Sequence, residues 1–227
     1  MTIADDYMTL LYSPATGRPV RWIQSSYVRS SLVGAILIEL TQLGRIRVRD
    51  TDPVRLEVTS TEPVDDPLLG AALSAVAENP DNRADDHMVS LVGSGHATID
   101  RVVLDRLVTS GQFHHARARA WRLIPIRRWY PVNLTRRETM RHRIHAVLVD
   151  GEPADRRTMA LIALLEKSVM VYKILDRLPR PEDAAMTDRI FRWQTQEWSL
   201  QGEPSVLTTD DVRLVSSVKK ARQAIQM

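Results

Sequence analysis

The segment SSLVGAILIELTQLG, residues 30–44, constrains the fold more than any other part of the chain. On a helix, its apolar residues would cover most of the circumference: Leu32, Ala35, Ile36, Ile38, Leu40 and Leu43. A helix that is apolar on nearly every side must be covered by other elements, because no face of it suits water. The pattern therefore predicts a central helix that is capped by one of two serine pairs, 25–26 or 30–31, and that ends at Gly44.

The rest of the chain has the pattern of shorter helices joined by tight turns. Capping residues and apolar periodicity predict further helices over residues 5–11, 68–78, 84–92, 97–110, 133–149, 155–178, 182–200 and 209–225. Alternating stretches predict two strand pairs, 45–49 with 55–59 and 114–119 with 121–126. Because the connections are short, we expect one domain over residues 1–227. The expected fold class is mainly α, a single compact helical bundle with two or three peripheral β-hairpins.

The composition and the missing motifs exclude several classes of function. The chain has no cysteine, so disulfides, thiolate nucleophiles and cysteine-ligated metals are excluded. No run reaches about 18 apolar residues, so we expect any membrane contact to be peripheral. The sequence holds no phosphate loop, dinucleotide fingerprint or nucleophile elbow. We therefore expect a cytoplasmic protein that is not an enzyme and that carries no metal or cofactor.

Positive charge is concentrated in one segment, although the net charge of the chain is only +3. Between Phe113 and His145 there are nine arginines against one acid, Glu138. Such a pole attracts phosphates or anionic lipid. Basic and aromatic residues are interleaved within it, and eight of them form a candidate membrane-facing hairpin: Arg117, Arg119, Trp121, Arg122, Arg127, Arg128, Trp129 and Tyr130.

Three explanations of this interleaved pattern are open. The first is docking on an anionic membrane, since each Arg near such a surface contributes about 1 kcal/mol and Trp and Tyr favour the interface. In the second, the aromatic residues pack inward and the arginines form an ordinary solvated face. Nucleic acid, which offers both phosphates and stacking bases, is the least favoured. The hairpin would also suit a contact between copies of the chain in a homo-oligomer.

Four stretches, in the same order along the chain, resemble signatures of the Golgi phosphoprotein 3 family. The first is LVGAILIELTQLGRIRV at residues 32–48, an apolar helix followed by Gly-Arg and a strand. The others are DDPLLGAAL at 65–73, LDRLVTSGQF at 104–113 with YPV at 130–132, and DRRTMALIALL at 155–165. Together they cover most of the chain, which by this resemblance is identified as a member of the family, of the bacterial type.

The resemblance implies a compact helical bundle with peripheral hairpins and a non-catalytic role at membranes. Eukaryotic members bind phosphatidylinositol 4-phosphate and the cytoplasmic tails of Golgi glycosyltransferases, and they bind coatomer through an Arg-rich N-terminal extension. Here the matching region starts almost at Met1, so we do not expect coatomer binding. The expected partner is an anionic phospholipid or phosphoinositide. The alternative is an adaptor that recruits or retains a client protein, with lipid binding incidental.

The headgroup pocket of the family does not transfer directly. Eukaryotic members place one Trp and three basic residues there, whereas the matching positions here are Gln24, Val33, Ala97 and Asp100. A displaced pocket made by Trp22, Arg29 and Arg101 would still supply an aromatic ring and two guanidiniums. The alternative is a half-buried Trp with unrelated surface arginines.

Glu39 interrupts the apolar surface of the central helix. A buried carboxylate needs a positive partner, and the helix that begins with DRRT offers Arg156 and Arg157. We therefore predict that Glu39 lies within salt-bridge distance of one of these two arginines.

Overall fold

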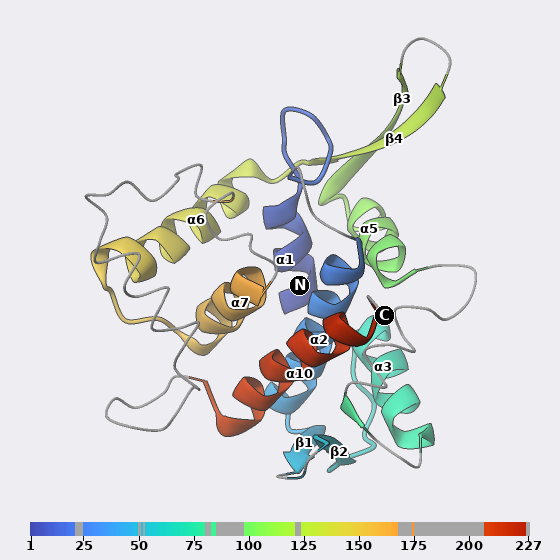
Figure 1. Ribbon diagram of the computed structural model, residues 1–227. Coiled ribbons are helices and arrows are strands. Elements are labelled where there is room, and N and C mark those ends of the chain that lie inside the picture. Colours follow the sequence, from blue (N-terminus) through green and yellow to red (C-terminus); the bar gives the residue numbers. More distant parts are fainter. Residues whose placement is uncertain are drawn as a thin grey trace.

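The computed structural model describes residues 1–20, 25–49, 51, 53–79, 83–84, 98–120, 124–167, 174 and 207–225. The helices in these ranges are α1 (Ile3–Leu11), α2 (Ser25–Gln42), α3 (Pro67–Glu78), α5 (Ile99–Thr109), α6 (Leu134–His145), α7 (Arg156–Lys167) and α10 (Thr209–Ile225), and α6 continues into a π-helical turn, Ala146–Asp150. The strands are β1 (Ile46–Arg49), β2 (Arg55–Val58), β3 (Phe113–Ala120) and β4 (Ile124–Pro131). The prediction of a mainly helical fold with peripheral hairpins is confirmed (Figure 1).

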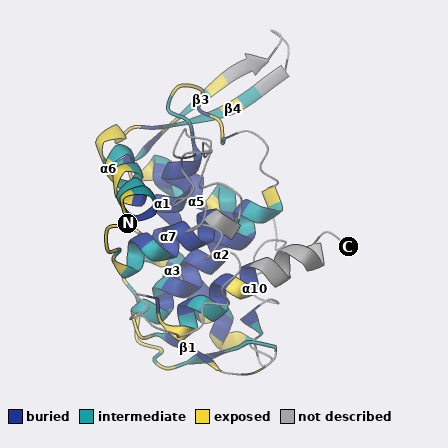
Figure 2. Ribbon diagram, turned by 60° about the vertical axis from the view of Figure 1, so that its left-hand side comes forward, coloured by how far each residue is buried: buried dark blue, intermediate teal, exposed yellow. Residues whose placement is uncertain are grey.

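Helix α2 lies in the middle of the bundle, as its apolar circumference predicts. It contacts α1, α3, α5, α7 and α10, and every residue from Ser30 to Ile38 is buried. Figure 2 shows these buried residues as dark blue ribbon at the centre of the molecule. The helix begins at Ser25, so the second serine pair, 30–31, lies inside it and does not cap it. Gly34 allows α10 to approach closely, because a Cβ at this position would lie 2.6 Å from Cγ2 of Val218.

Side chains at the helix ends satisfy backbone groups that have no partner within the helix. Thr2 and Asp5 form a capping box at the start of α1. Asn133 and Asp155 accept hydrogen bonds from backbone N–H groups at the starts of α6 and α7. After α2, Gly44 has a φ of 65°, a left-handed conformation that glycine adopts without steric cost. Local sequence signals therefore set several of the helix boundaries.

Both predicted strand pairs form two-stranded antiparallel sheets. The second strand of the later pair was wrongly placed, because it runs over Ile124–Pro131 and not over residues 121–126. Its register continues to the pair Phe113 and Pro131. Both of these residues are buried at the foot of the hairpin, so burial against the body extends the pairing beyond the predicted end.

The two hairpins lie at opposite ends of the helical body, with β3–β4 at the top and β1–β2 at the bottom of Figure 1. The predicted helices over 84–92 and 182–200 and the continuation of 155–178 beyond Lys167 lie outside the described residues, apart from Ala84 and Ile174.

Candidate functional site

The β3–β4 hairpin leaves the helical body as a projecting ribbon (Figure 1). Arg117 and Arg127 pair directly across its two strands, and both side chains are exposed. Like charges at directly opposite positions repel each other. Within the described part of the chain, neither guanidinium has a hydrogen bond or an ion pair with another residue. The two charges are therefore open to an anion from outside the protein.

Trp129 lies at the base of this hairpin and packs against the core instead of pointing into solvent. Its ring centroid is 6.2 Å from that of Tyr12 and 5.3 Å from that of His115. The guanidinium carbon of Arg101 lies 5.3 Å from the Trp129 centroid, which is a cation–π distance. Burial raises the pKa of Tyr12 to about 12, with the charge of Asp100 adding to the rise and Arg101 opposing it. The base is thus an aromatic cluster with a neutral phenol and one stacked positive charge.

The loop between α1 and α2 holds the hairpin base in place. The backbone N–H of Trp129 donates to the carbonyl of Gly17 at 2.9 Å, and Nη1 of Arg128 donates to the carbonyl of Thr16. Gly17 has a φ of 60°, and a Cβ at this position would lie 2.8 Å from the ring of Tyr130. Only glycine allows this close approach in this conformation. The hairpin is therefore fixed at its foot, while its arginine pair extends away from the body.

The structure divides the eight predicted hairpin residues into three groups. Arg117 and Arg127 are exposed, whereas Arg128, Trp129 and Tyr130 are half-buried. Arg119 lies in β3, but its side chain is outside the described part of the structure, as are Trp121 and Arg122 altogether. Among the described members, the outward-facing part of the predicted surface is therefore the arginine pair and not the indole of Trp129.

Two of the three residues proposed for the displaced headgroup pocket have their partners on α5. Arg29, from α2, donates through Nε to Oδ1 of Asp100 at 2.8 Å. Arg101 follows on α5 and pairs with Asp105 at 2.9 Å. The third residue, Trp22, lies outside the described residues, and the ring beside Arg101 is that of Trp129. Each arginine thus already has a carboxylate partner.

The structure describes two of the four positions that correspond to the headgroup pocket of the family. Val33 is fully buried inside α2. Asp100 is engaged by Arg29. Gln24 and Ala97 lie outside the described residues. The two described positions therefore offer no positive charge of their own.

Glu39 has the positive partner that its place in the central helix predicts. Its Oε1 lies 3.5 Å from Nη1 of Arg157, and its Oε2 accepts a hydrogen bond from the backbone N–H of Ile3. Arg156 pairs instead with Asp211 at 2.7 Å. Burial raises the pKa of Glu39, while the Ile3 N–H and Arg157 oppose that rise. The prediction is confirmed with Arg157 as the partner, and the contact ties the N-terminal segment to α2 and α7.

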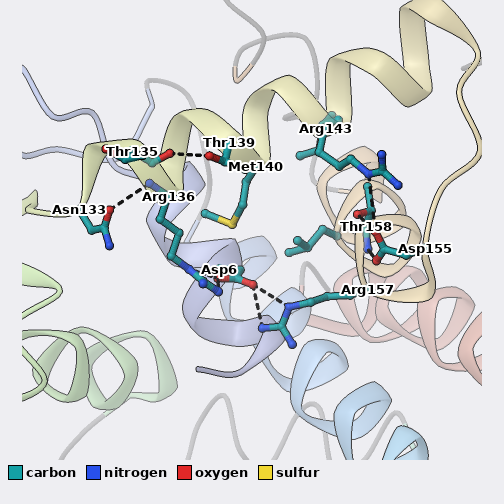
Figure 3. Close-up of a pocket in the computed structure, with 12 residues that line it drawn as sticks. Asp6, Asn133, Thr135, Arg136, Thr139, Met140, Arg143, Asp155, Arg157 and Thr158 are labelled. Atoms are coloured by element: carbon teal, nitrogen blue, oxygen red, sulfur yellow. Dashed lines mark hydrogen bonds and ion pairs between the residues drawn. The ribbon is translucent and has the colours of Figure 1, made fainter.

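Arg157 also lines a pocket of about 490 Å³ between α1, α6 and α7 (Figure 3). Asp6, which is only 2% exposed, joins two sides of this pocket. Its Oδ1 accepts from Nη2 of Arg136 at 2.6 Å, and its Oδ2 lies 2.7 Å from Nη2 of Arg157. Farther along α6, Nε of Arg143 lies 3.7 Å from Oδ2 of Asp155. Three arginines from two helices therefore face one cavity.

Two features of these sites were not predicted from the sequence. The first is the stacking of Arg101 on Trp129. Alternation along a strand shows that neighbouring residues face opposite sides, but it does not show which side meets the body. The second is the role of Asp6 as the shared partner of Arg136 and Arg157. An acid in the first turn of a helix is explained by the helix dipole alone, so the sequence gives no signal of its burial.

A comparison with known protein families matches residues 3–218 to Golgi phosphoprotein 3 (GPP34). The match includes both hairpins and every described helix except the end of α10. A search of curated proteins finds no match. In the part of the chain that the structure describes, no helix combines the length and the apolar character needed to cross a membrane. Because the match covers nearly its whole length, the chain belongs to the Golgi phosphoprotein 3 (GPP34) family.

Proposed function

We propose that this chain is a non-catalytic peripheral protein that docks reversibly on an anionic membrane surface through the β3–β4 hairpin. The observation that supports this proposal is the exposed pair Arg117 and Arg127, which has no carboxylate partner among the described residues. Two guanidiniums held opposite each other on a projecting ribbon attract the phosphates of acidic headgroups. Membership of the family supports a phospholipid, phosphoinositides included, as the source of those phosphates.

The arginine pair is strong enough for reversible docking but not for permanent attachment. Each arginine near an anionic bilayer contributes about 1 kcal/mol. Arg117 and Arg127 together then contribute about 2 kcal/mol, which is roughly a 30-fold factor in the partition constant. Salt weakens such binding, because the Debye length falls from about 10 Å at 0.1 M to about 3 Å at 1 M. On this proposal the protein exchanges between solution and the cytoplasmic face of a membrane.

The start of α5, beside the hairpin base, is the proposed place for a bound headgroup. Arg29 binds Asp100 there, and the next residue, Arg101, stacks on the ring of Trp129. A headgroup phosphate would bind these guanidiniums through charge-assisted hydrogen bonds. Since Asp100 already accepts from Arg29, the phosphate must compete with that carboxylate.

Co-sedimentation with lipid vesicles tests the proposal. We expect the protein to bind phosphatidylglycerol vesicles and not phosphatidylcholine vesicles. The double variant Arg117→Gln/Arg127→Gln should lower the partition constant roughly 30-fold. The matched control is Arg47→Gln/Arg49→Gln, which removes the same charge from exposed positions on the opposite hairpin and should leave binding close to that of the wild type.

Two results would show that the docking proposal is wrong. One is binding to both kinds of vesicle, or to neither, by the wild-type protein. The other is an equal loss of binding in the two double variants, which would assign the effect to net charge and not to the β3–β4 hairpin. Either result would favour the alternative in which the protein recruits a client enzyme and lipid contact is incidental.

A further inference from the structure

The pocket between α1, α6 and α7 contains guanidinium donors that no described residue uses. Arg157 is fully engaged, since its Nε donates to Asp6, its Nη2 to the carbonyl of Met1, and its Nη1 lies at 3.5 Å from Glu39. Arg136 gives Nε and Nη2 to Asp6, at 3.1 and 2.6 Å. Its Nη1 has no hydrogen-bond partner within the described ranges. One donor of Arg136 is therefore left over at the side of the pocket.

Arg143 holds the larger share of unused donors. Its nearest carboxylate oxygens, on Asp155 and Glu152, are both 3.7 Å away, which is beyond hydrogen-bond distance. The oxygens of Asp155 are occupied, because Oδ1 accepts from the backbone N–H of Thr158 at 2.9 Å and Oδ2 from its hydroxyl at 2.7 Å. Only Nη2 of Arg143 has a described acceptor, the carbonyl of Pro153 at 3.4 Å. Its Nη1 has no acceptor within hydrogen-bond distance, so the terminal edge of the guanidinium, formed by Nη1 and Nη2, can bind an oxyanion through two bonds.

The remaining lining fits the body of a small organic molecule. Met140, Ile144 and Leu161 supply apolar surface, and Thr135 and Thr139 supply hydroxyls. The volume of about 490 Å³ lies within the range of small-molecule sites. The charged residues that line the pocket are three arginines and two aspartates, so the lining has a net charge of +1. Glu152, 3.7 Å from Nη1 of Arg143, balances this charge. The guanidinium donors that no described residue uses, and not a net charge, therefore favour an anionic group, with room beside it for carbon and hydroxyl groups.

We propose that this pocket is a second ligand site, which binds a small phosphate ester. The phosphate lies on Nη1 and Nη2 of Arg143, and the carbon body covers Met140 and Ile144. Arg136 and Arg143 are seven residues apart on one face of α6, about 10.5 Å along the helix. Nη1 of Arg136 therefore donates to a second oxygen of the ligand and not to the same phosphate. None of these residues belongs to the β3–β4 hairpin, so this proposal stands or fails independently of membrane docking.

Titration of the full-length protein with glycerol 3-phosphate tests this site, with isothermal calorimetry and the side-chain Nε–H signals of arginine in NMR spectra as readouts. We expect saturable binding that shifts the Arg143 signal, and no binding of glycerol, which lacks the phosphate. Arg143→Gln should weaken binding at least about tenfold, since it removes charge-assisted hydrogen bonds. Arg127→Gln, which removes the same charge from the hairpin, should bind as the wild type does.

A second variant keeps the test valid even if Arg143→Gln were to unfold. Thr135 is exposed at the pocket lining, so Thr135→Trp should block the cavity and abolish binding while leaving every arginine in place. Phosphatidylglycerol vesicles distinguish the two sources of the phosphate. Competition between vesicles and glycerol 3-phosphate would assign the site to a lipid headgroup, and its absence would assign it to a soluble ester. Absence of saturable binding, or equal binding by wild type, Arg143→Gln and Thr135→Trp, would overturn the proposal.

Discussion

Gly34 is the position where one added methyl group should most clearly disturb the core. An alanine Cβ would lie 2.6 Å from Cγ2 of Val218 and 3.2 Å from Cδ2 of Leu164. Valine has little freedom to rotate away, so the clash should cost about 3 kcal/mol, near the upper end for overpacking. Better helix propensity returns about 1 kcal/mol. Gly34→Ala should therefore destabilise the protein by about 2 kcal/mol, which lowers Tm by roughly 4–8 °C for a chain of this length.

A double-mutant cycle separates this clash from a general effect on the helix. Val218→Ala alone removes two buried methyl groups and should cost about 2 kcal/mol. In the double variant the new Cβ occupies the space that the valine leaves, so the combined cost should be smaller than the sum by at least about 1 kcal/mol. Urea unfolding followed by far-UV circular dichroism measures all three variants. Costs that add within about 0.5 kcal/mol, or a Gly34→Ala variant more stable than wild type, would refute the close contact of α2 with α10.

Three further predictions follow from single residues. Gly17→Ala should loosen the hairpin base and increase proteolysis there, because the positive φ of Gly17 and the Tyr130 ring at 2.8 Å both oppose a Cβ. Gly44→Ala is the control: Gly44 has a positive φ but no neighbour within 4 Å, so this variant should increase proteolysis less. Burial raises the pKa of Glu39, so the folded state holds its proton to higher pH than the unfolded chain, and the contribution of Glu39 to stability falls as pH rises above the ordinary value of 4.5. The Tm of the wild type relative to Glu39→Gln should therefore decrease from pH 4.5 upward, and a rising difference would contradict this sign. Asp100→Asn frees Arg29 and removes one negative charge, so affinity for vesicles that contain phosphatidylinositol 4-phosphate should rise by about 1 kcal/mol, roughly fivefold; unchanged affinity would exclude the start of α5 as the headgroup site.

The features that followed from sequence are those where burial alone decides the outcome. The apolar circumference of residues 30–44 allowed only a central helix, and α2 lies at the centre. A carboxylate in that helix had to find a positive charge, and Glu39 finds Arg157. The sequence did not distinguish Arg157 from Arg156, because both lie in the first turn of α7 and only the packing of α10, which brings Asp211 to Arg156, separates their roles.

The features that could not be predicted depend on which surfaces meet. The second strand of the β3–β4 hairpin was predicted to end at residue 126, yet it continues to Pro131, since its foot is buried against the body. The alternating pattern could not decide whether Trp129 or its neighbours would face solvent. Trp129 turns toward the body because its ring contacts that of Tyr12, the residue that follows α1. Asp6 likewise becomes the centre of an ion-pair group only when α6 and α7 close over α1.

The central claim, that the arginine pair of the β3–β4 hairpin meets the membrane, can be measured with one label at each end of the molecule. The chain has no cysteine, so a single introduced cysteine takes up a fluorescent dye at a unique place. Ala116→Cys places the dye on the same ribbon as Arg117, one residue away and on the opposite face, and Thr51→Cys places it in the opposite hairpin. When phosphatidylglycerol vesicles are added, the dye at position 116 should shift to a less polar emission while the dye at position 51 stays unchanged. An equal response at both positions, or a response at position 51 alone, would contradict docking through this hairpin.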